Sequence, residues 1–334
     1  MEDALKQKDT LERQLRTLQG QLARIPAYDP DEETRLQAEL GAAAPYLAGQ
    51  VSAWLQALAC SPQPADYFRN PIGFPLLRLP WWLEKTLRPA PDAAFQGDLV
   101  ASTVSGYYFI RLLDNVMDGH SVAGEAGGAI PEVRLLPAAG FFHTQFQTPY
   151  QRYFESGHPF WEAFRRLWFD AAEVTARDAS LAEVRRADFD RYAARKVCAA
   201  IIPLAAVCYR YERPDRLAAW ARFVEAFGAW HQMWNDVFDW SKDLRHGTRT
   251  YFLSEAARRR RPDETPAAWV VREGFAWGLA DLEARLAEAA ALAEALDSPD
   301  LRAYLDRRAA RLRQQQADVA PGLEALVKLS RVMR

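Results

Sequence analysis

A pair of aspartates closes a predicted helix over residues 92–118. Asp114 and Asp118 are four residues apart, so both carboxylates leave the same face of that helix. Like charges at this spacing repel each other, and the negative end of the helix dipole disfavours them further. A cation should therefore compensate them, and Mg²⁺ suits the position because it binds carboxylate oxygens and shares substrate phosphates. Two solvated aspartates at a helix end are the alternative.

A second set of oxygen-bearing side chains follows the same spacing. Asn235, Asp239 and Asp243 fall at positions i, i+4 and i+8 of a predicted helix, which places them in a row about 12 Å long. Trp234 and Phe238 flank this row, so the sequence predicts that this side of the helix is buried. Because buried carboxylates need a partner, two such sets in a nearly neutral protein favour a site that binds a cation over two solvated surfaces.

The two acidic segments resemble metal-binding motifs of isoprenoid enzymes. The second, Asn235-Asp236-x-x-Asp239-x-x-Lys242-Asp243-x-x-x-Gly247, is similar to the second metal motif of class I terpene synthases. The first, Asp114-Asn115-x-x-Asp118, resembles the aspartate-rich first motif of the class I isoprenoid synthase superfamily, with Asn115 in place of the commoner Asp. The motifs stand in the order of that family, about 120 residues apart.

The resemblance implies a helical bundle with a central cavity and a magnesium-dependent site at its mouth. Three Mg²⁺ ions, with Mn²⁺ as a substitute, would hold an isoprenoid diphosphate. Asp114 and Asp118 would bind two of the ions, and Asn235, Asp239 and Asp243 the third. Metals and cationic side chains would then stabilise the charge that develops on the leaving diphosphate while the hydrocarbon becomes an allylic cation.

Several cationic or hydroxyl side chains are candidates for contact with the diphosphate. Arg191 is a candidate for the diphosphate-sensing arginine of terpene synthases, and Tyr192 with Lys196 resembles the Tyr-x-x-x-Lys region of prenyltransferases. Arg249 with Tyr251 is the nearest substitute for the Arg-Tyr pair of terpene synthases. The candidate set is Arg191, Lys196, Lys242, Arg249 and Tyr251. For each of them, a solvated or ion-paired surface position is the alternative.

The aromatic content, 12% of the residues, is enough to line a cavity for an apolar chain that carries a transient cation. Ring faces stabilise a desolvated cation by about 0.5–2 kcal/mol each without trapping it as nucleophiles would. Tyr107, Tyr108 and Phe109 precede the first acidic pair, and Trp230 and Trp234 precede or join the second set. Some of these side chains are expected to line the pocket, and plain helix packing is the alternative for each.

Helical periodicity along the chain predicts an all-α fold that positions these residues. No convincing alternating strand or hairpin turn is present. Residues 1–26 are predicted to form an N-terminal amphipathic helix with a heptad stripe, which packs on its own domain or pairs with a second copy in a homodimer. Residues 27–334 are predicted to form a single catalytic domain. Its expected helices span residues 32–58, 92–118, 158–177, 181–211, 214–246, 267–296, 299–317 and 322–332.

Composition limits the partners and the compartment. A net charge of −2 gives no basis for binding nucleic acid, because phosphate-backbone binding needs a strong basic excess. The longest apolar run, Val197–Tyr209, has 13 residues with Pro203 inside, so no membrane span is expected. Residues 1–24 lack the apolar core of a signal peptide. Three cysteines without metal-ligand spacing favour a reducing compartment, and the predicted location is cytoplasmic.

The sequence favours a one-substrate reaction. Trans-prenyltransferases carry an Arg-Arg-Gly segment after the first motif to hold a second diphosphate, whereas residues 119–128 contain no arginine. The predicted function is therefore a Mg²⁺-dependent terpene synthase that cyclises farnesyl diphosphate, or geranylgeranyl diphosphate, to a terpene hydrocarbon or alcohol. A trans-prenyltransferase and a squalene or phytoene synthase-like condensing enzyme are the alternatives with the same metal chemistry. A non-catalytic helical partner subunit is the alternative of another class.

Overall fold

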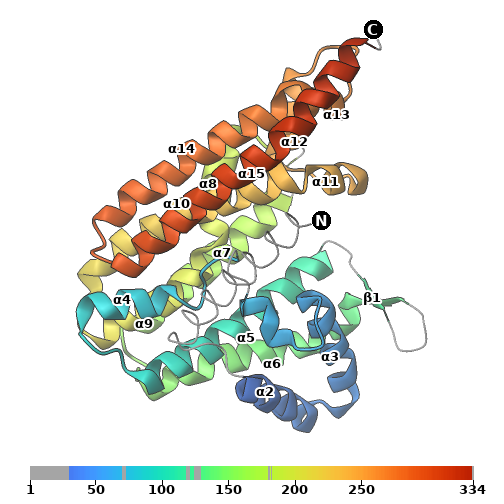
Figure 1. The fold of residues 1–334 in the computed structure, drawn as a ribbon. Coiled ribbons are helices and arrows are strands. Elements are labelled where there is room, and N and C mark those ends of the chain that lie inside the picture. Colours follow the sequence, from blue (N-terminus) through green and yellow to red (C-terminus); the bar gives the residue numbers. More distant parts are fainter. Residues whose placement is uncertain are drawn as a thin grey trace, which may run out of the picture. The chain divides into compact units, whose positions relative to one another are not determined.

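The computed structural model describes residues 30–69, 73–117, 121–123, 129–179, 181 and 183–332. These residues form helices and turns, together with one small antiparallel hairpin of β1 (Ser121–Ala123) and β2 (Ala129–Pro131), paired in the register Val122 to Ile130 (Figure 1). The predicted all-α class is confirmed. The predicted helix over residues 1–26 and the metal ligand Asp118 lie outside the described residues.

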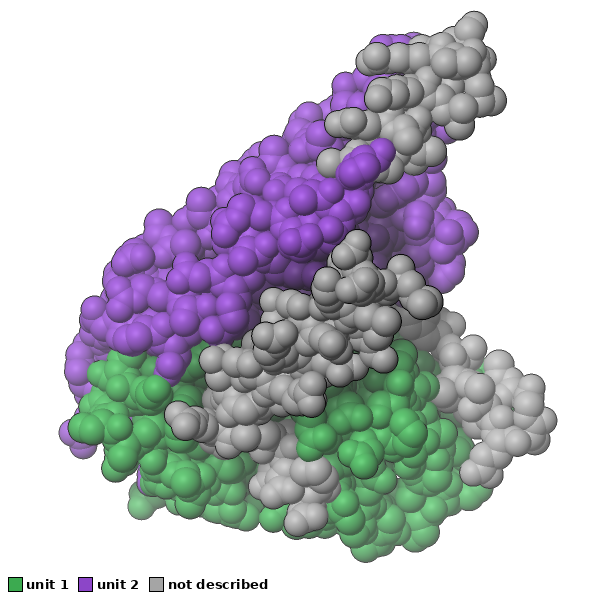
Figure 2. All heavy atoms as spheres, viewed as in Figure 1, with its two compact units in different colours: residues 1–158 green, residues 159–334 purple. Residues whose placement is uncertain are grey.

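The chain divides into two compact units, residues 1–158 and residues 159–334 (Figure 2). Each unit has its own set of buried apolar side chains. The single domain predicted for residues 27–334 stays a prediction. The first acidic segment belongs to the first unit and the second acidic segment to the second, and each is taken within its own unit below.

The first unit contains five α-helices among its described residues. The predicted helix over 32–58 is two helices, because Pro45 donates no backbone hydrogen bond and Ala44 leaves the helical conformation, with φ −143° and ψ 65°. Sequence periodicity missed the helix that ends at Gln147. The elements are α2 (Pro30–Ala43), α3 (Pro45–Ala59), the 3₁₀ turn η1 (Pro64–Arg69), α4 (Leu79–Leu87), α5 (Ala93–Met117), the 3₁₀ turn η2 (Glu132–Leu135), α6 (Leu136–Gln147) and the 3₁₀ turn η3 (Thr148–Arg152).

The core of the first unit holds α5, the helix that carries Asp114. Gly106 lets α6 come close, because a Cβ atom there would lie 2.8 Å from the ring of Phe146. Tyr108 of α5 packs edge to face against Trp54, with ring centroids 6.3 Å apart, and its hydroxyl donates to Glu33 over 3.1 Å. Burial of this aromatic contact fixes which side of α5 faces inward.

The second unit is a helical assembly in which two predicted long helices are broken. The expected helix 214–246 bends at Asp239, and the expected helix 181–211 is interrupted by a 3₁₀ turn. The elements are α7 (Phe160–Ala179), α8 (Arg186–Lys196), η4 (Cys198–Ile201), α9 (Ile202–Arg210), η5 (Pro214–Arg216), α10 (Leu217–Phe238), α11 (Trp240–His246), α12 (Tyr251–Arg259), α13 (Pro266–Trp269), the π-helical turn η6 (Val270–Gly274), α14 (Phe275–Glu294) and α15 (Pro299–Val332).

Helices α8 and α10 run antiparallel and in close contact. At one end, the Phe189 ring of α8 stacks on Tyr251, with ring centroids 4.8 Å apart, and the Tyr251 amide donates to Asp236 of α10. At the other end, the Val197 side chain after α8 lies against Gly228 of α10. Since 189 and 197 lie two turns apart, one face of α8 is committed to this packing.

No single helix among the described residues is long and apolar enough to cross a membrane. The pair Arg186–Lys196 and Cys198–Arg210 meets the criteria of length and composition only when its two parts are joined across a 41° bend. The part of this pair from Ile201 to Cys208 is buried inside the second unit.

We expect Gly228→Ala to lower the free energy of unfolding by about 1–3 kcal/mol, because the new methyl group would overlap the short, branched Val197 side chain at 2.5 Å. Urea unfolding measures the change. Gly97→Ala in α5 is the matched control, because nothing lies within 4 Å of its Cβ position, and it should raise stability by up to about 1 kcal/mol. Equal effects of the two substitutions would contradict the close packing of α8 on α10.

Candidate functional site

Asn235, Asp239 and Asp243, called the acidic ladder below, lie on successive turns in the second unit. The chain bends at Asp239, which has φ −97° and ψ 4° and joins α10 to α11. The backbone nevertheless keeps the helical spacing, because the Asp239 amide donates to the Asn235 carbonyl over 2.8 Å and the Asp243 amide to the Asp239 carbonyl over 3.0 Å. The predicted spacing of the three side chains is therefore present, on two helices instead of one.

The acidic ladder is accessible and has no protein partner. Asn235 and Asp239 are exposed and Asp243 is half-buried. Within the described part of the chain, none of these three side chains forms a hydrogen bond or an ion pair. The prediction that this side of the helix is buried was wrong, because the rings of Trp234 and Phe238 turn to the neighbouring face and pack on each other with centroids 4.6 Å apart.

The last carboxylate of the acidic ladder, Asp243, has a raised pKa. Burial raises the pKa of Asp243, and the nearby charge of Asp239 raises it further. Lys242 and His246 oppose this rise. Two carboxylates on successive turns, with an amide oxygen one turn further, form a set of hard oxygen donors for a divalent cation.

Asp236 is the buried carboxylate of this segment, and it was not among the site residues predicted from the sequence. It is 2% exposed and binds the first turn of α12, where the Tyr251 amide donates to it over 3.1 Å. Gln232 donates to its other oxygen over 2.8 Å. Burial raises the pKa of Asp236 to about 6, although these hydrogen bonds favour the charged form. The signal in the sequence was its position between the buried Met233 and Val237, on the apolar side of α10.

Two predicted diphosphate ligands next to the ladder are engaged elsewhere. Tyr251 is 2% exposed, and its ring lies between Phe189 and the edge-on ring of Trp277, 5.7 Å away. Arg249 donates through Nη1 to the Leu181 carbonyl over 2.9 Å, ahead of α8. A role in binding diphosphate would require Tyr251 to leave this packing. Lys242 is exposed on α11 and stays available.

The first acidic segment lies at the end of α5 in the first unit. Asp114 forms an ion pair with Arg111, one turn earlier, over 2.9 Å. The protein itself therefore supplies a cation that compensates this carboxylate. Asn115 is 6% exposed, and its Oδ1 has no hydrogen-bond partner among the described residues. Its buried amide cannot join Asp114 on the exposed side of the helix.

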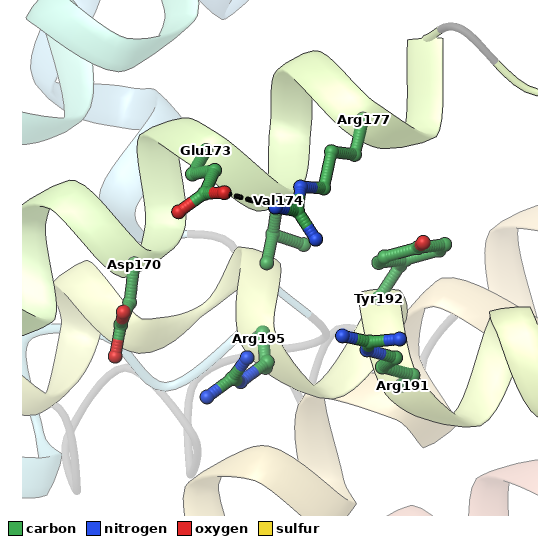
Figure 3. Close-up of a pocket in the computed structure, with 7 residues that line it drawn as sticks. All are labelled: Asp170, Glu173, Val174, Arg177, Arg191, Tyr192 and Arg195. Carbon is green, nitrogen blue, oxygen red and sulfur yellow. Dashed lines mark hydrogen bonds and ion pairs between the residues drawn. The ribbon is translucent and has the colours of Figure 1, made fainter.

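A pocket of about 220 Å³ lies between α7 and α8 (Figure 3). It brings the predicted Arg191 together with Arg195, which the sequence did not single out as a ligand. Lys196 is half-buried on the same helix and does not line it. The lining residues, called the arginine pocket below, are Asp170, Glu173, Val174 and Arg177 of α7 with Arg191, Tyr192 and Arg195 of α8.

No protein-family model matches this chain, and no curated protein matches it in sequence. Within the described residues, no three His, Cys, Asp or Glu side chains gather into a group that holds a metal ion on its own. A cation at the acidic ladder would therefore need the Asn235 oxygen, water or ligand oxygens in addition to the two carboxylates.

We expect the stability that Asp236 contributes to depend on pH. Its pKa is about 6 in the folded protein against 3.8 for an ordinary aspartate, so the contribution is complete below pH 4 and is lost as the pH rises through 6. The difference in unfolding free energy between the parent and Asp236→Asn should therefore fall by up to about 3 kcal/mol from pH 4 to pH 7.

Urea unfolding at several pH values measures this difference. Asp215→Asn is the control, because a hydrogen bond from Arg213 lowers the pKa of Asp215 and moves its titration below this range. The control difference should stay flat from pH 4 to pH 7. A flat difference for Asp236→Asn as well would show that burial does not shift this carboxyl.

Proposed function

We propose that this protein is a Mg²⁺-dependent class I terpene synthase that ionises an isoprenoid diphosphate, farnesyl in preference to geranylgeranyl, and cyclises the resulting cation. One observation carries the proposal. Asn235, Asp239 and Asp243 present three oxygen-bearing side chains on successive turns, and the described part of the protein leaves all three without a partner. Their spacing is that of the motif that the sequence resembles.

The chemistry of the donor set supports Mg²⁺. One amide oxygen and two carboxylates are hard ligands, and no imidazole or thiolate belongs to the set. Mg²⁺ usually takes one or two protein carboxylates and completes its shell with water and substrate phosphates, so a set with two carboxylates is sufficient. When bound, Mg²⁺ neutralises charge on the leaving diphosphate. Asn235, Asp239 and Asp243 would hold the ion at the junction of α10 and α11.

Other side chains of the segment fit the same reaction. Lys242 is exposed next to Asp243 and offers a positive charge to the diphosphate. Trp234 and Phe238 pack on each other along α10, with ring centroids 4.6 Å apart, whereas Trp230 is fully buried with the Arg308 guanidinium 5.4 Å from its ring. Ring faces of this kind stabilise a cation by about 0.5–2 kcal/mol. The sequence resemblance assigns Asp114, in the first unit, to binding Mg²⁺.

A condensing enzyme is the alternative that shares this metal chemistry. The one-substrate prediction rested on the missing Arg-Arg-Gly segment, which left no cationic site for a second diphosphate. Arg191 and Arg195 supply cationic side chains at another place in the fold. The products distinguish the two candidates.

We expect a cyclic hydrocarbon or terpene alcohol when the protein is incubated with Mg²⁺ and farnesyl diphosphate alone, with geranyl and geranylgeranyl diphosphate as parallel substrates. Activity should disappear in EDTA and return with Mg²⁺ or Mn²⁺, because the donors are oxygens. Mass spectrometry of the products measures both effects. Longer prenyl diphosphates that form only with isopentenyl diphosphate would establish the condensing enzyme. If no product forms under any of these conditions, the result supports a non-catalytic partner subunit.

We expect Asn235→Ala, Asp239→Ala and Asp114→Ala each to lower kcat by about a hundredfold or more, because each removes a side chain assigned to metal binding. Unfolding free energy should stay within about 0.5 kcal/mol for Asp239→Ala, since its side chain has no partner to lose. Glu288→Ala, an exposed acid on α14, is the control and should keep full kcat. If these variants are less stable but their folded molecules keep the parent kcat, the ladder has a structural role and not a catalytic one.

A further inference from the structure

The arginine pocket contains two guanidinium groups that the protein leaves unpaired. Arg191 and Arg195 are exposed, and neither forms a hydrogen bond or ion pair with any described residue. The third arginine of the pocket, Arg177, is paired with Glu173 one turn away, as the dashed line in Figure 3 shows. Asp170 lines the same pocket, yet it forms no ion pair with either free arginine.

The charges of the lining residues favour an anion. Three arginines stand against two carboxylates in the lining, and Arg177 is paired with Glu173. Glu225 of α10, outside the lining, is a third acid, and the charge of Arg195 opposes the rise in its pKa that burial causes. Arg191 and Arg195 stand one helical turn apart on α8, a spacing at which both planar groups can contact one ligand. Guanidinium groups bind phosphate oxygens through paired hydrogen bonds.

The rest of the lining gives the pocket one wall of fixed shape. Val174 is 4% exposed and forms an apolar wall on α7. The Tyr192 ring lies 5.7 Å from the guanidinium carbon of Arg191, a contact that limits the freedom of that side chain, and its hydroxyl adds a donor. A volume of about 220 Å³ accommodates a phosphate or a diphosphate group.

The pocket is separate from the acidic ladder. Phe189 and Val197 commit one face of α8 to packing toward α10, the helix that carries Asn235. At 100° per residue, Arg191 and Arg195 leave α8 on the side away from Phe189. The pocket that they line is bounded by α7, and Arg195 also acts on Glu225 of α10. Arg191 therefore belongs to a second site and is not a ligand of an anion held at the ladder.

We infer that the arginine pocket is a second, metal-independent binding site for the phosphate or diphosphate group of a ligand, held by Arg191 and Arg195. This inference stands independently of the proposed function, because it requires neither Mg²⁺ nor turnover. A protein with an anion site of this kind can bind a second phosphorylated molecule while the ladder is occupied.

Calorimetric titration of the full chain with inorganic diphosphate in EDTA tests the inference. Chelation removes binding through metal at the ladder and leaves binding at the pocket. We expect saturable binding of one diphosphate per chain, weakened at least tenfold by Arg191→Gln and by Arg195→Gln and lost in the double variant. Arg313→Gln, which removes an exposed arginine of α15, and Asp239→Ala should leave the affinity unchanged.

Absence of saturable binding to the parent protein in EDTA would overturn the inference, and so would undiminished binding in the double variant. Unchanged thermal unfolding of the glutamine variants checks that they fold, as expected for exposed side chains without ion pairs. A parallel titration with an alkyl diphosphate identifies the source of the phosphate group. If the alkyl diphosphate binds more tightly than inorganic diphosphate, the ligand is a diphosphate ester. If it binds more weakly, the ligand is the free anion. If the protein binds diphosphate in EDTA but makes no terpene, the second site is supported and only the proposed function is contradicted.

Discussion

The buried carboxylate of Asp236 organises the second unit. It accepts hydrogen bonds from Gln232 on its own helix and from the first amide of α12, so it joins two helices at a point shielded from water. A helix N-terminus carries partial positive charge, which stabilises a carboxylate in this position. Tyr251, which supplies the amide, also stacks on Phe189 of α8. The contacts of Asp236 and Tyr251 therefore join α8, α10 and α12 at one place.

The orientation of Asp236 decides which side chains remain accessible. Because Asp236 and Val237 face inward, Asn235 and Asp239 face outward on the same helix. The same contact fixes the rotation of α8 through Phe189, and this rotation turns Arg191 toward α7. The acidic ladder and the arginine pocket thus lie on two sides of one pair of packed helices. Their separation follows from packing and not from the charges themselves.

Other buried acids of the second unit are paired with arginines. Glu264 is 6% exposed and receives two hydrogen bonds from Arg272, at 2.7 and 2.8 Å, which hold the pKa of Glu264 at about 2. Asp281 is 8% exposed and accepts from Arg285 over 2.6 Å. The protein satisfies these buried acids with its own side chains, whereas the accessible oxygens of the ladder have no protein partner among the described residues.

The sequence by itself determined the helical class, the spacing of the ladder and the oxygen chemistry of its donors. These follow from side-chain type and from the 3.6-residue period, both of which are local properties. Tertiary structure decided what the period left open. It bent the predicted helix at Asp239, buried Asp236 instead of the ladder, and enclosed Tyr251 in the aromatic core. It also supplied Arg111 as a partner for Asp114 and brought Arg195 beside Arg191 across from α7.

The physical reason is that a helical pattern specifies which residues share a face but not which face meets a neighbour. Trp234 and Phe238 were apolar enough to predict burial, yet they cover only the flank of the ladder, because burial is decided by the helices that pack against them. Pairing of charges likewise depends on side chains that are distant in sequence, as for Arg285 and Asp190. The side-chain types of each segment follow from the sequence. Long-range packing decides which of these groups are paired within the protein and which remain accessible.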